Sequence, residues 1–121
     1  MEKNKTLVLG ASDNPGRYSY LAIHRLRSKG KPVVGIGKRR TRVGDVDIET
    51  EKKDWPDIDT ISIYLNPRNQ REYYEYLLSL KPRRIIFNPG AENEELENLA
   101  RENQILTQEA CTLVLLSTGQ Y

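Results

Sequence analysis

Short apolar runs alternate along the chain with segments in which apolar residues recur at helical spacing. The first run, residues 6–9, is continuously apolar, as expected for a central parallel strand that is covered on both faces. This pattern predicts five strands, at residues 6–9, 32–36, 59–65, 84–87 and 104–106.

The segments between and after these runs predict helices. Gly30 and Pro82 follow the first two of them, and both are residue types that end helices. The stretch 41–51 predicts irregular backbone, with a short edge strand near residues 46–48. Four helices are expected, at residues 19–29, 68–80, 93–102 and 110–117.

The alternation of strands and helices predicts an α/β fold in three layers, with helices on both faces of a five-stranded parallel sheet. Right-handed crossovers from a central first strand give the strand order 3-2-1-4-5. The 121 residues are expected to form a single domain, residues 1–121. Ligands bind such sheets outside the carboxyl ends of the strands, where the winding reverses.

The first strand leads into the segment KTLVLGASDNPGR, residues 5–17, which is typical of a strand, a glycine-containing loop and the start of a helix. Gly10 lets the backbone turn sharply and Pro15 stiffens the loop. Backbone N–H groups and the helix N-terminus favour an anion such as a phosphate. The spacing of Gly10 and Gly16 matches neither the P-loop nor the dinucleotide motif GxGxxG, so an ordinary strand-to-helix connection remains an open interpretation.

A basic turn, residues 37–40 with the sequence GKRR, follows the second strand. A dinucleotide site has an acidic residue at this position for the ribose hydroxyls, whereas a basic cluster suits a phosphorylated ribose. Two ligands fit: NADP, with its 2′-phosphate, and coenzyme A, with its 3′-phosphate. The alternative interpretation is a solvated turn on an exposed edge.

Composition narrows the range of partners. The 19 basic and 17 acidic residues leave a formal net charge of +2, too close to balance to indicate nucleic acid. No apolar stretch approaches the length of a membrane span and the N-terminus lacks the apolar run of a signal peptide, so no membrane partner is expected. The single cysteine, Cys111, excludes an internal disulfide and gives no metal cluster, and the chain is expected to be cytoplasmic.

No constellation of catalytic side chains is visible in the sequence. The only histidine, His24, falls in the middle of a predicted helix, and a lone cysteine such as Cys111 is more often a small core residue than a reactive thiol. No pair of acid and base, or of nucleophile and base, gathers at the expected ligand edge. The pattern favours binding without independent catalysis and predicts no catalytic residue and no metal site.

Five segments together carry a resemblance to a known family: GASDNPGRYSY, PVVGIGKR, YLNP, FNPGAENEEL and EAC. They resemble the small stand-alone CoA-binding domains (the YccU-like proteins), which are similar to the CoA-binding domain in the α-subunit of succinyl-CoA synthetase. The resemblance covers residues 6–111 and is most specific in the first loop, G-A-S-x-N-P. It implies a Rossmann-like single domain that binds coenzyme A or an acyl-CoA.

The resemblance also implies which positions contact the ligand. The first loop would hold the CoA phosphates, with side-chain contacts from Ser12, Asn14 and Arg17. The family's N-P-K after the second strand is I-G-K here, so Lys38 keeps the basic residue but the proline is lost. The ligand-binding residues expected on these grounds are Gly10, Ala11, Ser12, Asn14, Pro15, Arg17, Lys38, Arg39, Asn66, Pro67, Asn88 and Gly90.

Two further turns of the family complete the expected site. The turn Asn66-Pro67 matches the one that lies against the adenine in related domains. The turn at residues 88–90 matches one where the family often has Gln and Gly, so that Gly90 is retained and would face the pantetheine arm.

Three functions remain to be weighed. The first is a module that binds CoA or an acyl-CoA without chemistry of its own. The second is an NADP-binding oxidoreductase subunit or fragment, which the lack of a second mononucleotide-binding half and of a catalytic group disfavours. The third is an interaction domain whose partner enzyme carries out the chemistry. The sequence names no partner, and a homodimer stays open.

Overall fold

The computed structural model describes residues 2–121, which form an α/β fold around one sheet of seven strands in the order β3-β4-β2-β1-β5-β6-β7. Neighbouring strands are parallel except for β3, which pairs with β4 in the antiparallel sense. The strands are β1 (Lys5–Ala11), β2 (Val33–Gly37), β3 (Thr41–Val43), β4 (Val46–Glu49), β5 (Ile58–Ile63), β6 (Arg84–Phe87) and β7 (Leu106–Glu109).

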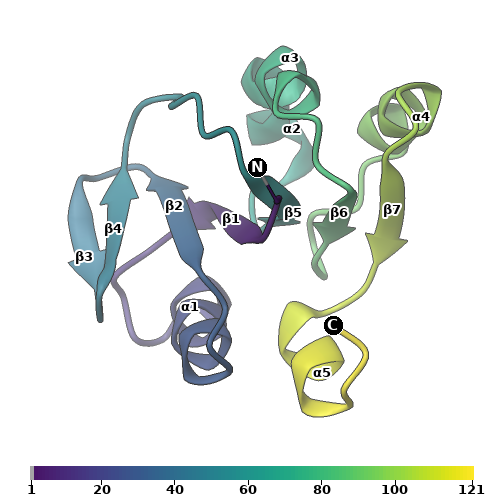
Figure 1. The fold of residues 1–121 in the computed structure, drawn as a ribbon. Helices are drawn as coiled ribbons and strands as arrows, with labels where there is room; N and C mark the ends of the chain where they lie inside the picture. The colour runs from purple at the N-terminus through teal and green to yellow at the C-terminus, as the bar shows by residue number, and fades with distance from the viewer. Residues whose placement is uncertain (1) are drawn as a thin grey trace.

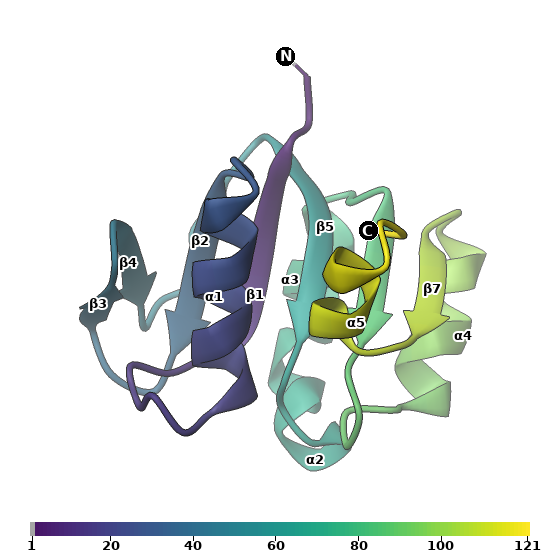
Figure 2. The same cartoon turned by 90° about the horizontal axis from the view of Figure 1, so that it is seen from below.

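Helices cover both faces of this sheet, so the described part of the chain has three layers. In Figure 1, α1 and α5 lie on one face, and α2, α3 and α4 lie on the other. Figure 2 shows the carboxyl ends of the parallel strands gathered at one edge, with the N-terminus beyond the opposite edge. The helices are α1 (Tyr18–Ser28), α2 (Pro67–Gln70), α3 (Tyr74–Ser79), α4 (Glu94–Glu102) and α5 (Thr112–Ser117), and a 3-10 turn, η1 (Arg71–Tyr73), joins α2 to α3.

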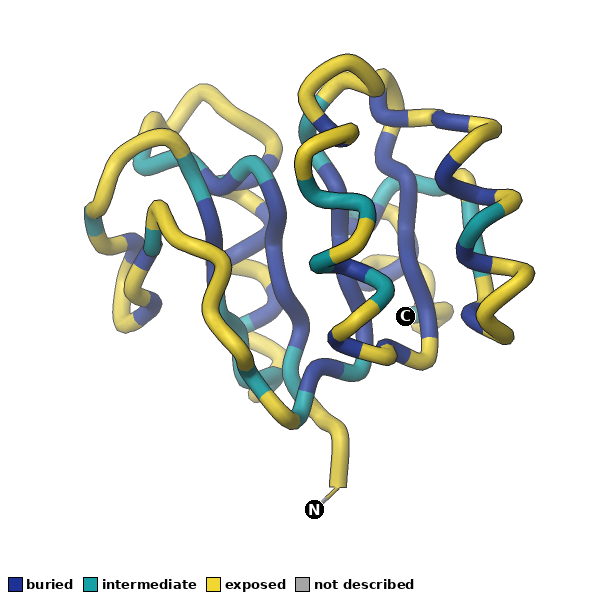
Figure 3. Tube along the Cα trace, turned by 90° about the horizontal axis from the view of Figure 1, so that it is seen from above, coloured by how far each residue is buried: buried dark blue, intermediate teal, exposed yellow. Residues whose placement is uncertain are grey.

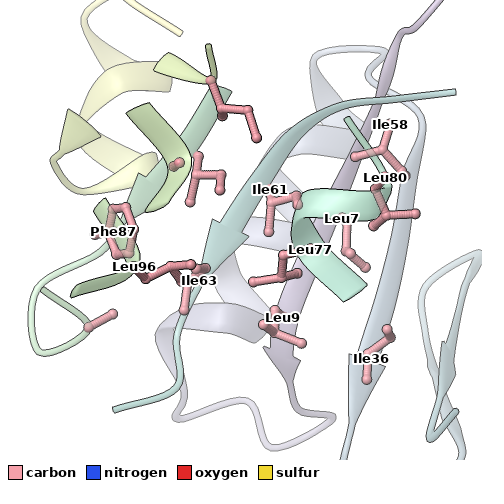
Figure 4. Packing of buried hydrophobic residues seen from close by; sticks show 14 residues of the cluster. Leu7, Leu9, Ile36, Ile58, Ile61, Ile63, Leu77, Leu80, Phe87 and Leu96 are labelled. Atoms are coloured by element: carbon pink, nitrogen blue, oxygen red, sulfur yellow. The ribbon is translucent and has the colours of Figure 1, made fainter. Parts of the chain in front are cut away.

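The central strand β1 is buried on both faces, which is why three consecutive residues in it, Leu7, Val8 and Leu9, are apolar. Alternate side chains point to opposite layers: Leu7 and Leu9 pack in the cluster that contains Leu77, whereas Val8 packs in the cluster that contains Ile23. Figure 4 shows the first cluster, and Figure 3 shows buried residues concentrated in the central strands. The two clusters fix the strands whose ends carry the site.

The expected strand order was wrong. The strand predicted at residues 59–65, observed as β5, pairs with β1 on the side opposite β2. The place next to β2 is taken by β4, the edge strand predicted near residues 46–48, and β3 adds a further strand outside it. Because this hairpin already covers the outer edge of β2, the next strand crosses to the free side of β1, and the sheet has seven strands instead of five.

Several element boundaries also differ from the predictions. The helix predicted at residues 68–80 is interrupted by η1, although its apolar residues Leu77 and Leu80 are buried as the spacing indicated. The strand predicted at residues 104–106 begins only at Leu106, because Gln104 has a positive φ of 58° in the turn that ends α4. The predicted short C-terminal helix is confirmed as α5.

Candidate functional site

A cleft of about 1080 Å³ opens at the carboxyl ends of the central strands. Its walls come from the loop after β1, the start of α1, the basic turn after β2, the turn after β5, and η1. This is the edge at which open α/β sheets bind ligands. Eight of the sequence-predicted residues line it: Gly10, Ala11, Ser12, Asn14, Arg17, Lys38, Arg39 and Asn66.

At the floor of the cleft, the backbone at the ends of β1 and β2 and the residue Leu65 after β5 approach one another closely. Gly10 has a φ of +90° and is an extra residue in the pairing of β1 with β2, between Leu9 and Ala11. A Cβ at Gly10 would lie 3.1 Å from Cδ2 of Leu65, and a Cβ at Gly37 would lie 2.2 Å from the backbone oxygen of Ala11. Both glycines are therefore required by the backbone geometry that brings the first loop and the basic turn together.

The first loop is shaped by its own side chains. The hydroxyl oxygen of Ser12 accepts the N–H of Asn14 at 3.0 Å, and Oδ1 of Asn14 accepts the N–H of Gly16 at 2.9 Å. The hydroxyl hydrogen of Ser12 and the side-chain amide of Asn14 have no partner among residues 2–121. The loop thus keeps hydrogen-bond donors available at the cleft, which suits an anionic ligand.

The charges of the basic turn are not equally available. Arg39 donates from Nη2 to both carboxylate oxygens of Asp13, at 2.6 and 2.7 Å, and Arg40 pairs with Glu49 at 3.4 Å. Hydrogen bonding by Thr41 and by Arg39 holds the pKa of Asp13 below its usual range, so this carboxylate is charged at neutral pH. In the part of the chain that the structure describes, Lys38 has no acidic partner.

Arg17 is a second basic side chain at the cleft without an acidic partner within residues 2–121. It is the N-cap residue of α1, with an extended backbone, and α1 has no acidic residue in its first turn. The positive end of the helix dipole and two unpaired basic side chains, Arg17 and Lys38, therefore bias this cleft toward anions.

Four of the sequence-predicted residues do not line the cleft. Pro15 is exposed, Gly90 donates its N–H to Oε1 of Glu92, and Pro67 lines a separate pocket of about 540 Å³ between α2 and the start of α4. These three residues lie in turns at the expected edge of the sheet, but they were expected in the binding site and they do not line the cleft.

Asn88, the fourth of these residues, is buried and fully used inside the protein. Its Nδ2 donates to Oγ of Ser62 at 2.9 Å and to the backbone oxygen of Ile63 at 3.0 Å. Its Oδ1 accepts the N–H of Thr112 at 2.8 Å. The side chain thus joins the ends of β5 and β6 to the start of α5.

Three tyrosines in the cleft wall were missed as site residues. Tyr18, directly after Arg17, exposes 69% of its surface, and Tyr73 lies under Nζ of Lys52, 5.3 Å from its ring centroid. Burial raises the pKa of Tyr64 to about 12, so its phenol is neutral at pH 7 and does not act as a base. Tyr18 had a signal in the sequence, its position at the helix start, and Tyr64 begins the YLNP segment.

His24 and Cys111 do not belong to the cleft. His24 is exposed on α1, where its ring meets that of Tyr20 edge-on at 4.6 Å, and Cys111 is half-buried before α5. Within residues 2–121 no three His, Cys, Asp or Glu side chains are grouped to hold a metal ion. None of the described helices is long and apolar enough to cross a membrane.

Comparison with known proteins gives a family. A family model described as a CoA binding domain matches residues 4–117. A solved structure of a protein described as uncharacterized is 45% identical, with all of both chains covered and a TM-score of 0.95. No curated protein matches the chain.

More distant solved structures share the fold alone. A hypothetical protein from Pyrococcus horikoshii OT3 is 20% identical, with 96% of this chain and 83% of that chain covered and a TM-score of 0.86. The biliverdin reductase of Synechocystis sp. PCC 6803, solved with biliverdin and NADP+, is 18% identical, with 93% of this chain but 39% of that chain covered and a TM-score of 0.65.

Proposed function

The chain belongs to the CoA binding domain family, and we propose that it binds coenzyme A or an acyl-CoA in the cleft at the carboxyl ends of its strands. The observation that carries this proposal is the pairing, in one cleft, of a glycine-bulged first loop with the unpaired Lys38. The first loop would take the diphosphate, and the basic turn would take the 3′-phosphate of the ribose.

The diphosphate end rests on donors that the loop does not use itself. The side-chain oxygens of Ser12 and Asn14 accept hydrogen bonds from the loop backbone, and both side chains retain donor hydrogens. Arg17 adds a positive charge at the start of α1, where the helix dipole already favours an anion. The positive φ of Gly10 favours glycine at this position. Because glycine has no side chain, the ligand can approach the backbone closely at the floor of the cleft.

The remaining contacts of the ligand follow the same edge. Asn66 lines the cleft and caps α2 by accepting the N–H of Asn69, which leaves its side-chain amide to face the adenine. Pro67 and Gly90 would border the path of the pantetheine arm beyond the cleft. Asn88 is assigned a supporting role, because its three hydrogen bonds hold the turn and no polar group is left for a ligand.

We propose binding without chemistry of its own. The carboxylates in the cleft wall are Asp13, which Arg39 and Thr41 hold, and the exposed Glu72. Within residues 2–121, neither faces a histidine or a thiol. Burial raises the pKa of Tyr64 to about 12, so its phenolate, the form that could act as a base, is not populated at neutral pH. A partner enzyme would then supply any reaction of the bound thioester.

The second candidate is NADP binding as an oxidoreductase subunit or fragment. The basic turn favours it, because Lys38 would serve a 2′-phosphate as well as a 3′-phosphate. The shared fold with an NADP+-bound reductase is consistent with it, although this chain covers only 39% of that protein. The family match makes CoA the first choice.

Calorimetric titration with CoA, dephospho-CoA and NADP tests the proposal. We expect CoA to bind, and dephospho-CoA to bind at least about fivefold more weakly, because loss of each exposed charge pair costs about 1 kcal/mol. Lys38→Gln should weaken CoA by about fivefold and leave dephospho-CoA unchanged. Arg42→Gln is the matched control, since Arg42 is exposed, pairs with Asp47 and lies outside the cleft.

Two results would contradict the proposal. Absence of binding by both CoA and dephospho-CoA would remove the ligand, and equal affinity for the two would remove Lys38 from the phosphate site. Tighter binding of NADP than of CoA would favour the second candidate.

A further inference from the structure

A carboxylate stands in the anion cleft beside the basic turn. Asp13 belongs to the first loop, and both of its oxygens are bound: Oδ1 and Oδ2 accept from Nη2 of Arg39, and Oδ2 also accepts the hydroxyl of Thr41 at 2.8 Å. All three residues line the cleft. An acidic group at this place opposes a phosphate bound beside it.

The two partners of this ion pair are held unequally. The side chain of Asp13 is 31% exposed and is fixed through its own loop on one side and through Thr41 on the other. The side chain of Arg39 is 72% exposed, and only its Nη2 is engaged. Its Nε and Nη1 have no hydrogen-bond partner in residues 2–121. Arg39 is therefore the partner that can leave, and Asp13 is the one that stays.

We propose that Asp13 is a specificity-determining residue that competes with the ligand for Arg39. In the free protein Asp13 holds the guanidinium at the cleft wall, and a phosphate monoester on the ribose displaces the carboxylate from it. This inference rests on the proposed function, because it concerns the ribose end of the same ligand. A ligand with a free ribose hydroxyl leaves the pair of Asp13 and Arg39 intact.

The charges explain why this competition selects among ligands. With Asp13 present, Lys38 is the one basic side chain of the turn that can contact the phosphate without breaking an ion pair. Arg39 must first break its ion pair with Asp13, and Arg40 is paired with Glu49. A phosphate monoester carries up to two charges and three acceptor oxygens, and so it can replace a single carboxylate. A hydroxyl cannot, because it offers no charge. Asp13 therefore lowers affinity more for ligands that carry the monoester than for those that carry the diphosphate alone.

Titration of the Asp13→Asn variant with CoA and dephospho-CoA tests the inference. Asparagine keeps an oxygen for Thr41 but loses the charge that holds Arg39. We expect CoA affinity to rise about threefold, as for release of an exposed ion pair, and dephospho-CoA affinity to rise by less; an equal gain for the two ligands would overturn the inference. Asp45→Asn is the matched control, because it removes the same charge from an exposed pair with Arg27, outside the cleft, and should change neither affinity.

The Arg39→Gln variant provides an independent measurement. It should weaken CoA about threefold and leave dephospho-CoA unchanged, and in its background Asp13→Asn should gain less than in the native protein. Weaker or unchanged CoA binding by Asp13→Asn would overturn the inference while CoA binding itself stands. If neither the native protein nor any variant binds CoA, both the proposed function and this inference are wrong. Thermal unfolding of each variant verifies that it is folded.

Discussion

Single side chains decide how much positive charge the cleft offers. Arg39 and Arg40 are both paired with carboxylates, so Lys38 and Arg17 are the basic side chains left to a ligand. Because these two lie at the basic turn and at the start of α1, the unpaired charge is divided between the proposed ribose phosphate and the proposed diphosphate. A bare count of basic residues would have overstated the charge of this edge.

Asn88 gives a prediction at this scale. Asn88→Ala removes three buried hydrogen bonds and leaves the N–H of Thr112 without a partner, whereas the hydroxyl of Ser62 keeps its bond to that of Thr112. We expect the free energy of unfolding to fall by roughly 3 kcal/mol, as measured by urea denaturation. The control is Asn98→Ala on the exposed face of α4, where the change should stay within about 0.5 kcal/mol.

The same variant separates a supporting role from ligand contact. At a temperature where Asn88→Ala is fully folded, its affinity for CoA should match that of the native protein. A loss of affinity with little loss of stability would instead place Asn88 on the pantetheine arm, as the sequence resemblance implied.

The sequence could identify Ser12, Asn14 and Lys38 as cleft residues, because each follows directly after a strand whose carboxyl end is easy to locate. It could not show that Asn88 turns inward, since the partners of Asn88 come from β5 and α5, far away in the chain. It also could not show that Asp13 binds Arg39, because that contact depends on how the first loop and the basic turn face each other.

At the scale of elements, the crossing of β1 and β2 positions the site. Gly10 inserts one residue into β1, and Gly37 lies against the backbone oxygen of Ala11. Because neither position tolerates a side chain easily, the geometry of the cleft floor depends on backbone contact between the two strands.

Gly37→Ala tests this dependence. The new Cβ would lie 2.2 Å from the backbone oxygen of Ala11, and the strand must shift to relieve the clash. We expect a loss of about 3 kcal/mol in the free energy of unfolding, at the upper end for overpacking. Gly16→Ala is the control: its Cβ would lie 3.4 Å from the side-chain oxygen of Asn14, so urea denaturation should show little change. Equal stability of the two variants would contradict a tight crossing.

Elements with strong apolar patterns were predictable, and the short edge strands were not. β1, β5 and β6 are largely buried and rich in leucine, isoleucine and valine, so their sequence marks them. β3 and β4 are short and alternate with charged residues such as Arg42 and Asp47, which pair across the hairpin. The Gly44-Asp45 turn between them was a hairpin signal, and it would have predicted the pairing of β3 with β4.

At the scale of the whole molecule, the sheet acts as a platform whose carboxyl edge holds the cleft. Two hydrophobic clusters, one on each face, fix the central strands, and the loops that line the cleft extend from those strands. Figure 2 shows the first loop and the turns after β2 and β5 leaving the sheet at the same edge. A ligand that binds there would contact segments widely separated in the sequence.

An NMR titration of the native protein with CoA tests the central claim most directly, because it reports the position of the ligand residue by residue. We expect saturable shifts of the backbone amides in residues 10–19 and 36–41. With dephospho-CoA, the shifts in the first loop should stay similar, and those in the basic turn should become smaller. Absence of shifts, or shifts confined to α5 and β7, which lie outside the cleft, would contradict CoA binding in this cleft.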